Sequence, residues 1–508
     1  MARIAILVCF FIATGGSVFA QDSGDRFADT LNELQTRMQQ LEEQNARLTE
    51  QLETLKSPTE SADEKTVPAD EPLPESSMLE QLIQSSQQSD DRLSSLEERL
   101  RQDDETAKKK KAEDAKKEKK WFEKYTIRGY TQMRINEVFR DDSPARPQAV
   151  GDSSIGDNQS FLIRRARLVF QGDVSDHLSF YIQPDFATAV PGSPDSNQFA
   201  QIRDFYADIY LDDQKELRLR VGQSKMPYGW ENLQSSGQRL PLDRNDAMNS
   251  AFKNERDLGV MFYWTPTEVQ ETFDYMNKEG FKWSGNYGMF GGGICNGQGG
   301  SLREQNDNLT AVARFTLPFW LNQSQLVEMG IQGYAGQYTV LSSAISPLGI
   351  GPAVRPSGTL ETGEIDGIDD KRLACSFIYY PQPFGFQSEW NIGRGPALND
   401  AQTHVDQSAL YGGYAMAMYR HKLRKGELLP FARWNYFQGG YRTERNAPYC
   451  EIQEWEFGTE WQFSKSLELV SMYTITDRTN TTAISSANTR SYEQFSGQMV
   501  RFQVQFNY

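Results

Sequence analysis

From residue 125 to the C-terminus, the chain consists of short segments in which apolar and polar residues alternate. In the last segment one face carries Val500, Phe502, Val504, Phe506 and Tyr508, and the other carries Arg501, Gln503, Gln505 and Asn507. A period of two is the pattern of a β-strand with one apolar and one polar face. A soluble sheet and a membrane-spanning barrel can both use such a strand. The aromatic residue that ends this apolar strand favours the closing strand of an outer-membrane barrel.

We count sixteen such segments, joined by connections that are alternately long and short. The predicted strands are Tyr125–Phe139, Phe161–Gly172, His177–Phe186, Ile202–Leu211, Glu216–Gln223, Leu258–Trp264, Asn286–Cys295, Leu309–Leu317, Leu326–Tyr338, Leu373–Tyr380, Phe384–Gly393, Leu410–Tyr419, Leu428–Phe437, Ile452–Phe463, Leu467–Thr476 and Val500–Tyr508. Long loops on one side and short turns on the other are typical of outer-membrane barrels. One connection departs from this rule, because Thr265–Lys282 is long where a short turn is expected. The pattern predicts an all-β fold for residues 121–508, a sixteen-stranded antiparallel transmembrane β-barrel.

The composition agrees with a barrel and not with a helical membrane protein. Hydrophobic residues make up 38% of the chain, and the mean hydropathy is −0.64. Beyond the first twenty residues, no apolar run approaches the roughly 18 residues that a membrane-spanning helix needs. A barrel strand escapes this requirement, since every second residue faces the lumen and can be polar.

The first 120 residues divide into four predicted parts that precede the barrel. Residues 1–20 have the basic start and apolar core of a secretory signal peptide. Residues 21–56 predict an α-helical coiled coil, with Leu31, Met38, Asn45 and Leu52 at heptad position a and Phe27, Leu34, Leu41, Leu48 and Leu55 at position d. Residues 57–77 predict a disordered linker, and residues 78–120 a second helical and basic spacer. The alternative for 21–56 is a helix packed on a globular core, and the Lys-rich run before Trp121 fits either a solvated helix face or a basic collar at the membrane surface.

Charge and reactive residues exclude several classes of function. The net charge of −16 argues against nucleic acid as a partner, although pore selectivity depends on the charges of the wall rather than on this sum. The histidines are His177, His404 and His421, and they form no recognisable Ser/His/acid or metal-binding pattern. The mature chain keeps Cys295, Cys375 and Cys450, either as isolated residues or with one pair bridging loops. We therefore expect no enzyme activity, no cofactor and no metal.

The alternation also assigns each charged residue to a face. A charge on the lipid face costs roughly 2 to 4 kcal/mol at mid-bilayer, so arginines of the strands should face the lumen. This places Arg128, Arg134, Arg165, Arg167, Arg218, Arg220, Arg314 and Arg501 in the lumen, and Arg164 near the membrane interface. Acidic residues also face inward, namely Asp204, Asp208, Glu454, Glu456 and Glu460. The arginines can therefore give a net anion preference, or they can be neutralised by these acids.

The long connection Ser224–Arg256 is the candidate constriction loop, since a loop folded into the barrel there would narrow the pore. Its basic residues are Lys225, Arg239, Arg244, Lys253 and Arg256, and its acidic residues are Glu231, Asp243, Asp246 and Glu255. This balance fits a transverse field across a constriction, and it fits equally a set of pairs that hold the loop in place.

Four motifs carry a resemblance to a known family. They are RRARL at Arg164–Leu168, RVGQSKMPYGWE at Arg220–Glu231, ERDLGV at Glu255–Val260, and NG at Asn296–Gly297. With these motifs the sequence resembles the phosphate-selective porin O and P family. The resemblance implies a sixteen-stranded barrel, usually trimeric, that passes small anions such as phosphate across the outer membrane. It also implies Arg165, Arg167, Arg220 and Lys225 as residues that contact the anion.

Two functions from different classes therefore stand against each other. The first is an outer-membrane porin that passes small anions by diffusion through an arginine-lined lumen narrowed by an inward loop. The alternative is a structural tether, in which the barrel is an anchor and the periplasmic coiled coil connects the outer membrane to peptidoglycan. Outer-membrane lipid is the expected surrounding of the barrel in both cases.

Overall fold

A computed structural model describes residues 121–140, 155, 161–187, 200–300, 302–322, 324–480 and 493–508. The predicted signal peptide, coiled coil, linker and basic spacer lie outside these described residues. No helix in the described part of the chain combines the length and apolar character that crossing a membrane requires.

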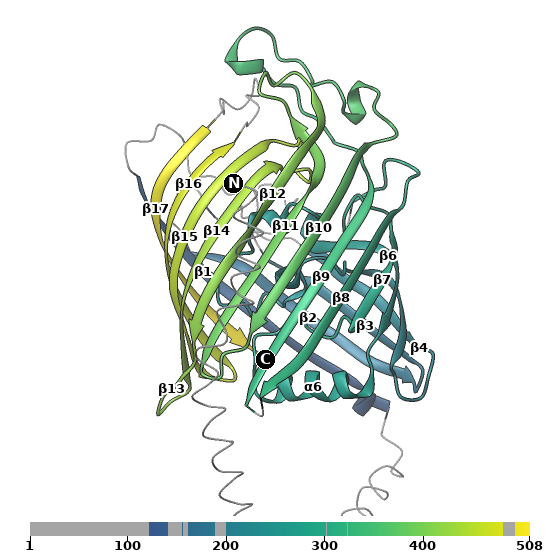
Figure 1. The fold of residues 1–508 in the computed structure, drawn as a ribbon, viewed down its shortest axis with the longest axis vertical. Helices are drawn as coiled ribbons and strands as arrows, with labels where there is room; N and C mark the ends of the chain where they lie inside the picture. Colours follow the sequence, from purple (N-terminus) through teal and green to yellow (C-terminus); the bar gives the residue numbers. More distant parts are fainter. Residues whose placement is uncertain are drawn as a thin grey trace, which may run out of the picture. The chain divides into compact units, whose positions relative to one another are not determined.

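The described residues form a closed barrel of sixteen long antiparallel strands, as the sequence predicted (Figure 1). The long strands are β1 (Tyr125–Arg140), β2 (Leu162–Ser175), β3 (Leu178–Asp185), β4 (Gln201–Tyr210), β5 (Leu217–Lys225), β6 (Arg256–Trp264), β7 (Phe290–Cys295), β8 (Thr310–Asn322), β9 (Gln325–Tyr338), β10 (Ile368–Tyr379), β11 (Phe384–Leu398), β12 (Val405–Tyr419), β14 (Glu427–Gly440), β15 (Tyr449–Ser464), β16 (Leu467–Asn480) and β17 (Glu493–Asn507). The two-residue strand β13 (His421–Lys422) continues β12 along β14. Pairing of β1 with both β2 and β17 closes the barrel and leaves no free sheet edge.

The described residues also form seven helices, most of them a single turn. They are η2 (Trp121–Lys124), α4 (Trp230–Leu233), α5 (Asp246–Asn249), η3 (Lys253–Glu255), α6 (Thr267–Lys278), η4 (Pro347–Gly349) and η5 (Leu360–Thr362).

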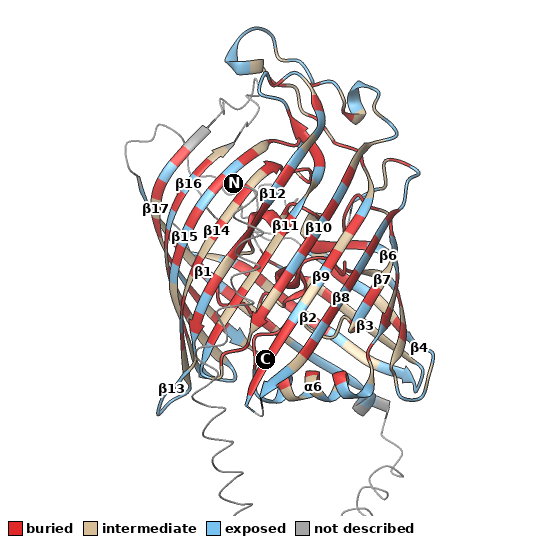
Figure 2. Ribbon diagram, viewed as in Figure 1, coloured by how far each residue is buried: buried red, intermediate tan, exposed pale blue. Residues whose placement is uncertain are grey.

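The period-two pattern separates an exposed apolar surface from a buried polar interior (Figure 2). On β17, Phe502 and Phe506 are exposed, whereas Arg501 and Gln503 are buried. The inward and outward faces therefore follow the alternation that the sequence shows.

The connection Thr265–Lys282, too long for a turn, contains the amphipathic helix α6. Its residues Val269, Phe273 and Met276 recur at helical spacing and are buried. They pack in one cluster with Trp230, Phe281, Trp283, Leu326, Ile378 and Tyr380. Because residues 279–289 continue this packed segment, β7 begins at Phe290 and not at the predicted Asn286.

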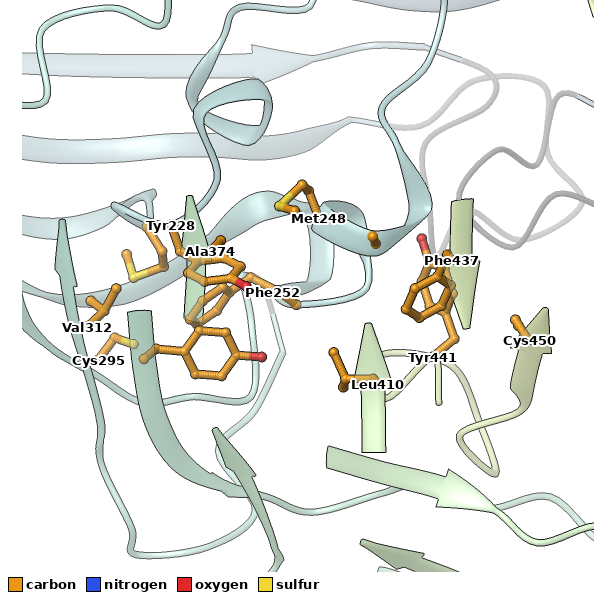
Figure 3. Close-up of a cluster of buried hydrophobic side chains, with 14 of the residues drawn as sticks. Tyr228, Met248, Phe252, Cys295, Val312, Ala374, Leu410, Phe437, Tyr441 and Cys450 are labelled. Carbon is orange, nitrogen blue, oxygen red and sulfur yellow. The ribbon is translucent and has the colours of Figure 1, made fainter. Parts of the chain in front are cut away.

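The interior of the barrel holds an apolar core, which the alternation alone did not predict. In Figure 3, Tyr228, Met248 and Phe252 of the β5–β6 connection face residues on the inner wall. The wall residues labelled there are Cys295, Val312, Ala374, Leu410, Phe437, Tyr441 and Cys450. Cys295 and Cys450 are buried free thiols, and Cys375 lies on the exposed face of β10. The shared apolar cluster shows that the β5–β6 connection is packed against one side of the barrel wall.

Candidate functional site

The connection between β5 and β6, residues 226–255, lies inside the barrel and is anchored to its wall. The backbone N–H groups of Trp230 and Glu231 donate to the carboxylate of Glu389 on β11 at 2.5 and 3.1 Å. The Glu231 carboxylate lies 2.6 Å from Arg433 Nη1 on β14. All four residues are buried, so these charge-assisted bonds are shielded from water. The loop is thus fixed on the wall formed by β11 and β14.

The motif Arg220–Glu231 builds the start of this loop. Gly229, with φ of 82°, precedes α4 in a conformation that favours glycine. Lys225 Nζ donates to the carbonyl oxygens of Leu233 and Gln234 at 2.8 and 2.9 Å. The Lys225 ammonium, predicted to contact the anion, is therefore engaged with the carbonyl end of α4.

The motifs Glu255–Val260 and Asn296–Gly297 join at the end of the loop. Asp257 Oδ2 accepts hydrogen bonds from the backbone N–H groups of Gly297 and Gly299, at 2.6 and 3.3 Å. Gly297 has φ of 101°, and a Cβ there would lie 2.4 Å from Thr310 Oγ1. Only glycine fits this position without strain.

A β-bulge on β2 corrects the predicted position of Arg164. Gln132 pairs with Arg165 and Met133 with Ile163, which leaves Arg164 as an extra residue. The alternation puts Arg164 on the lipid-facing side of β2, but the residue is 7% exposed, and its Nη2 is 3.8 Å from the loop residue Asp243. Because the extra residue breaks the alternation, Arg164 and Arg165 both face the interior.

A second bulge, on β4, places Arg203 in the interior, which the sequence analysis missed. Gln183 pairs with Asp204 and Pro184 with Ile202, so Arg203 is the extra residue. Proline in a strand interior is confined to bulges and edges, because it lacks an N–H for the ladder. Pro184 is therefore the sequence signal that could have revealed this bulge.

Four arginines surround one carboxylate of the loop. Asp243 Oδ2 lies 2.9 Å from Arg134 Nη1 and 2.5 Å from Arg501 Nη2. Asp243 Oδ1 lies 3.8 Å from Arg164 Nη2 and 3.9 Å from Arg165 Nη2. These four cations come from β1, β2 and β17, on the part of the wall where the barrel closes.

A second acidic residue of the loop, Glu255, has a cationic surrounding of its own. Its carboxylate lies 2.7 Å from Arg244, 2.8 Å from Arg256 and 3.6 Å from Arg203. Burial alone would raise the pKa of Glu255, but the guanidinium groups of Arg244, Arg256 and Arg203 hold it well below its usual range. Arg256 also pairs with Asp204 at 2.8 Å, so it is shared between two carboxylates.

A cavity of about 60 Å³ lies between the two bulges and the loop, large enough for several water molecules. It is lined by Arg164, Arg165, Arg167, Asp185, Arg203, Asp243, Arg244, Asn249, Lys253, Asn254, Glu255, Tyr441, Thr443 and Glu444. Six of these side chains are basic and four are acidic, an excess of two positive charges. The basic residues come from both the wall and the loop.

The remaining arginines of the predicted site are paired on the wall. Arg167 lies 2.7 Å from Asp185, Arg220 and Arg218 lie 2.7 and 3.5 Å from Asp208, and Arg314 lies 3.1 Å from Glu328. Arg220 also stacks on the ring of Tyr206, at 3.8 Å from its centroid. Of these, the structure brings Arg167 alone to the cavity.

The remaining predicted residues have separate surroundings. Lys253 of the loop lies 2.7 Å from Glu444, at the cavity. Arg239 Nη2 donates to Leu242 O at 3.5 Å, and burial, followed by the nearby Arg244, lowers the pKa of Arg239 to about 9. Arg128 is exposed and donates to Gln171 at 3.2 Å, away from the cavity.

A few lumenal side chains of β1 to β4 are accessible to water. Arg128, Gln171, Tyr181 and Tyr206 on β1 to β4 are exposed or half-buried. By contrast, lumenal side chains of β8 to β16 are buried, and much of that wall carries the loop and α6. The loop therefore fills the space beside β8 to β16. On the wall of β1 to β5, the arginines that face the loop are buried as well, with Arg134, Arg165 and Arg203 at 1%, 4% and 5% exposure.

The chain matches one known family in sequence and is similar to several solved outer-membrane proteins in structure. A sequence model of the phosphate-selective porin O and P family matches residues 147–508. Among solved structures, the chain is similar to an anion-selective porin from Comamonas acidovorans, with 10% identity, 76% of this chain and 99% of that chain covered, and a TM-score of 0.44. It is also similar to the outer-membrane channel DcaP of Acinetobacter baumannii, with 12% identity, 76% of this chain and 97% of that chain covered, and a TM-score of 0.44. A third similar structure is the trimer form of the outer-membrane protein OmpT of Vibrio cholerae, with 10% identity, 76% of this chain and 99% of that chain covered, and a TM-score of 0.44.

No curated protein matches the chain by sequence. The family match nevertheless covers most of the chain, includes all four motifs and spans every strand except β1. The closed barrel has the exposed apolar surface that a protein of the outer membrane needs. The chain belongs to the phosphate-selective porin O and P family and is an outer-membrane porin.

Proposed function

We propose that this porin passes small anions by diffusion and prefers oxyanions such as phosphate. The observation that carries the proposal is the cavity between the loop and β2 and β4, where six basic side chains face four acidic ones. A guanidinium group offers several N–H donors in one plane, which match the oxygens of an oxyanion. Diffusing anions would therefore be held there more strongly than cations.

Pairing weakens most of the other arginines as anion sites. Arg220 forms two bonds to Asp208, at 2.7 and 2.9 Å, and Arg314 shares Glu328 with Thr316 and Tyr380. A buried pair of this kind leaves little net charge for a passing ion. Arg203 differs, because its contacts with Gln201, Asn254 and Glu255 are long, from 3.3 to 3.6 Å. We propose Arg164, Arg165 and Arg203 as the main anion contacts, and Arg167, which is paired with Asp185 at 2.7 Å, as a weaker one.

The path that we propose runs between the wall of β1 to β5 and the loop. The loop narrows the lumen from the opposite side, since its anchors Glu389 and Arg433 lie on β11 and β14. An anion would pass between the loop and the two bulges, where Asp243 and Glu255 balance part of the positive charge. A homotrimer, implied by the family resemblance, is part of this proposal, and the mass of the detergent-solubilised particle tests it.

Single-channel recording in planar bilayers tests the proposal. Phosphate added to a chloride solution should reduce the chloride conductance in a saturable way, because both anions use the same cavity. Replacing Arg165 with Gln should weaken this inhibition, whereas Arg420→Gln, which removes a charge paired with Glu427 outside the cavity, should leave it unchanged. Cation selectivity of the wild type, or equal inhibition of all three channels, would contradict the proposal.

A further inference from the structure

We propose that Asp243 is a tethered counter-ion, a carboxylate of the loop that competes with the permeating anion for Arg164 and Arg165 and so determines how tightly the porin holds its substrate. This inference rests on the proposed anion function and identifies the residue that regulates it. Asp243 belongs to the cavity lining and is 17% exposed at its side chain, whereas Arg164 and Arg165 are 8% and 5% exposed.

The surroundings of Asp243 match those of a bound oxyanion. Its Oδ2 takes the two short contacts, to Arg134 and Arg501 at 2.9 and 2.5 Å. Its Oδ1 lies 3.8 and 3.9 Å from Arg164 and Arg165, within range of a strong charge interaction but beyond hydrogen-bond distance. An oxyanion in the cavity would meet the same two guanidinium groups, and their charge is already shared with Asp243.

The backbone of the loop does not depend on this carboxylate for its position. Arg134 Nη2 donates to Leu242 O at 3.0 Å, and Arg433 Nη2 donates to the backbone oxygen of Asp243 at 2.9 Å. Leu240 and Leu242 are buried in a cluster with side chains of β12, β14 and β16. Since the main chain is held by these contacts, the Asp243 carboxylate can be neutralised while the loop stays in place.

A tethered group acts at a high effective concentration, so Asp243 would lower the apparent affinity for a free anion. At a separation near 6 Å, one charge changes the affinity for a monovalent ion about threefold in water and about a hundredfold at an effective dielectric constant of 20. We therefore expect Asp243→Asn to tighten phosphate inhibition about tenfold and to shift the reversal potential further toward anions.

The matched control is Asp246→Asn, the same change three residues along the same loop. Asp246 is not part of the cavity lining, and it pairs with Arg478 at 3.0 Å. When Asp246 is neutralised, Arg478 still has a second carboxylate, Glu454, at 2.8 Å. Asp243→Glu keeps the charge and should resemble the wild type. If Asp243→Asn fails to insert into bilayers, Asp243→Ser serves for the same measurement.

Reversal potentials in a KCl gradient and phosphate titrations decide the matter. Stronger anion preference and tighter phosphate inhibition in Asp243→Asn, but not in Asp246→Asn, support the inference. If the wild type prefers anions and Asp243→Asn equals it, or turns toward cations, Asp243 is not a competitor and the inference is overturned while the anion function stands. A wild type that prefers cations overturns the anion function itself.

Discussion

Replacing Arg203 with Gln should weaken anion binding with little effect on the barrel. Arg203 lies on the β4 bulge, is 5% exposed and lines the cavity. Its polar contacts are long, and its acidic neighbour Glu255 keeps Arg244 and Arg256 at 2.7 and 2.8 Å. The loss of Arg203 therefore leaves no carboxylate without a cation, and the stability should change by about 1 kcal/mol or less.

The effect on binding follows from the distance between the charges. An anion about 5 Å from the Arg203 guanidinium interacts with it by about 0.8 kcal/mol in water and about 3.3 kcal/mol at an effective dielectric constant of 20. The dissociation constant of phosphate should therefore rise about 4- to 270-fold. Single-channel chloride conductance, titrated with phosphate, measures this constant directly.

Two further variants serve as comparisons for Arg203→Gln. Arg203→Lys keeps the charge and should retain most of the affinity. Arg256→Gln removes a cation that Asp204 and Glu255 share, so it should destabilise the barrel by about 3 to 5 kcal/mol. If Arg203→Gln leaves phosphate inhibition unchanged in a barrel of normal stability, the assignment of the cavity as the anion site is wrong.

Three other predictions concern the scaffold. Gly297→Ala should destabilise the barrel by about 1 to 3 kcal/mol more than Gly363→Ala. Both glycines have φ near 100°, but a Cβ at residue 297 would clash with Thr310 Oγ1, whereas a Cβ at residue 363 has no atom within 4 Å; urea unfolding of the two variants measures the difference. Phe273→Ala should cost about 3 to 5 kcal/mol by leaving a cavity under α6, whereas the exposed Glu271→Ala should change little; thermal unfolding shows the difference. Because the pKa of Glu255 is lowered in the fold, its ion pairs stabilise the fold fully above the unfolded carboxyl pKa of about 4.3, and this stabilisation is lost as the pH falls. The wild type should therefore lose more stability than Glu255→Gln between about pH 5 and pH 3. Unfolding experiments at each pH measure this loss.

The sequence predicted the strands and their faces because period-two alternation follows directly from the geometry of a strand between lipid and water. Arg134, Arg165 and Arg501 are buried in the barrel, and their contact with a permeating ion stays a prediction. The alternation fails where the backbone departs from the regular ladder. Arg164 and Arg203 are extra residues in bulges, and an extra residue shifts the faces of a strand without changing its composition.

The interior arrangement of the loop could not be predicted from spacing. Asp243 meets Arg501, 258 residues later in the chain, only because the barrel closes and the loop turns inward. The apolar patches of the inner wall, such as Val312 and Leu410, conflict with a simple rule of polar lumens, and they make sense only with Met248 and Phe252 packed nearby. Tertiary packing, which leaves no periodic signal, determined these features.

The most direct test of the account is the reversal potential of the wild-type channel in a tenfold KCl gradient across a planar bilayer. An excess of positive charge at the cavity predicts a potential shifted toward the equilibrium potential of chloride. A potential shifted toward that of potassium would contradict the account.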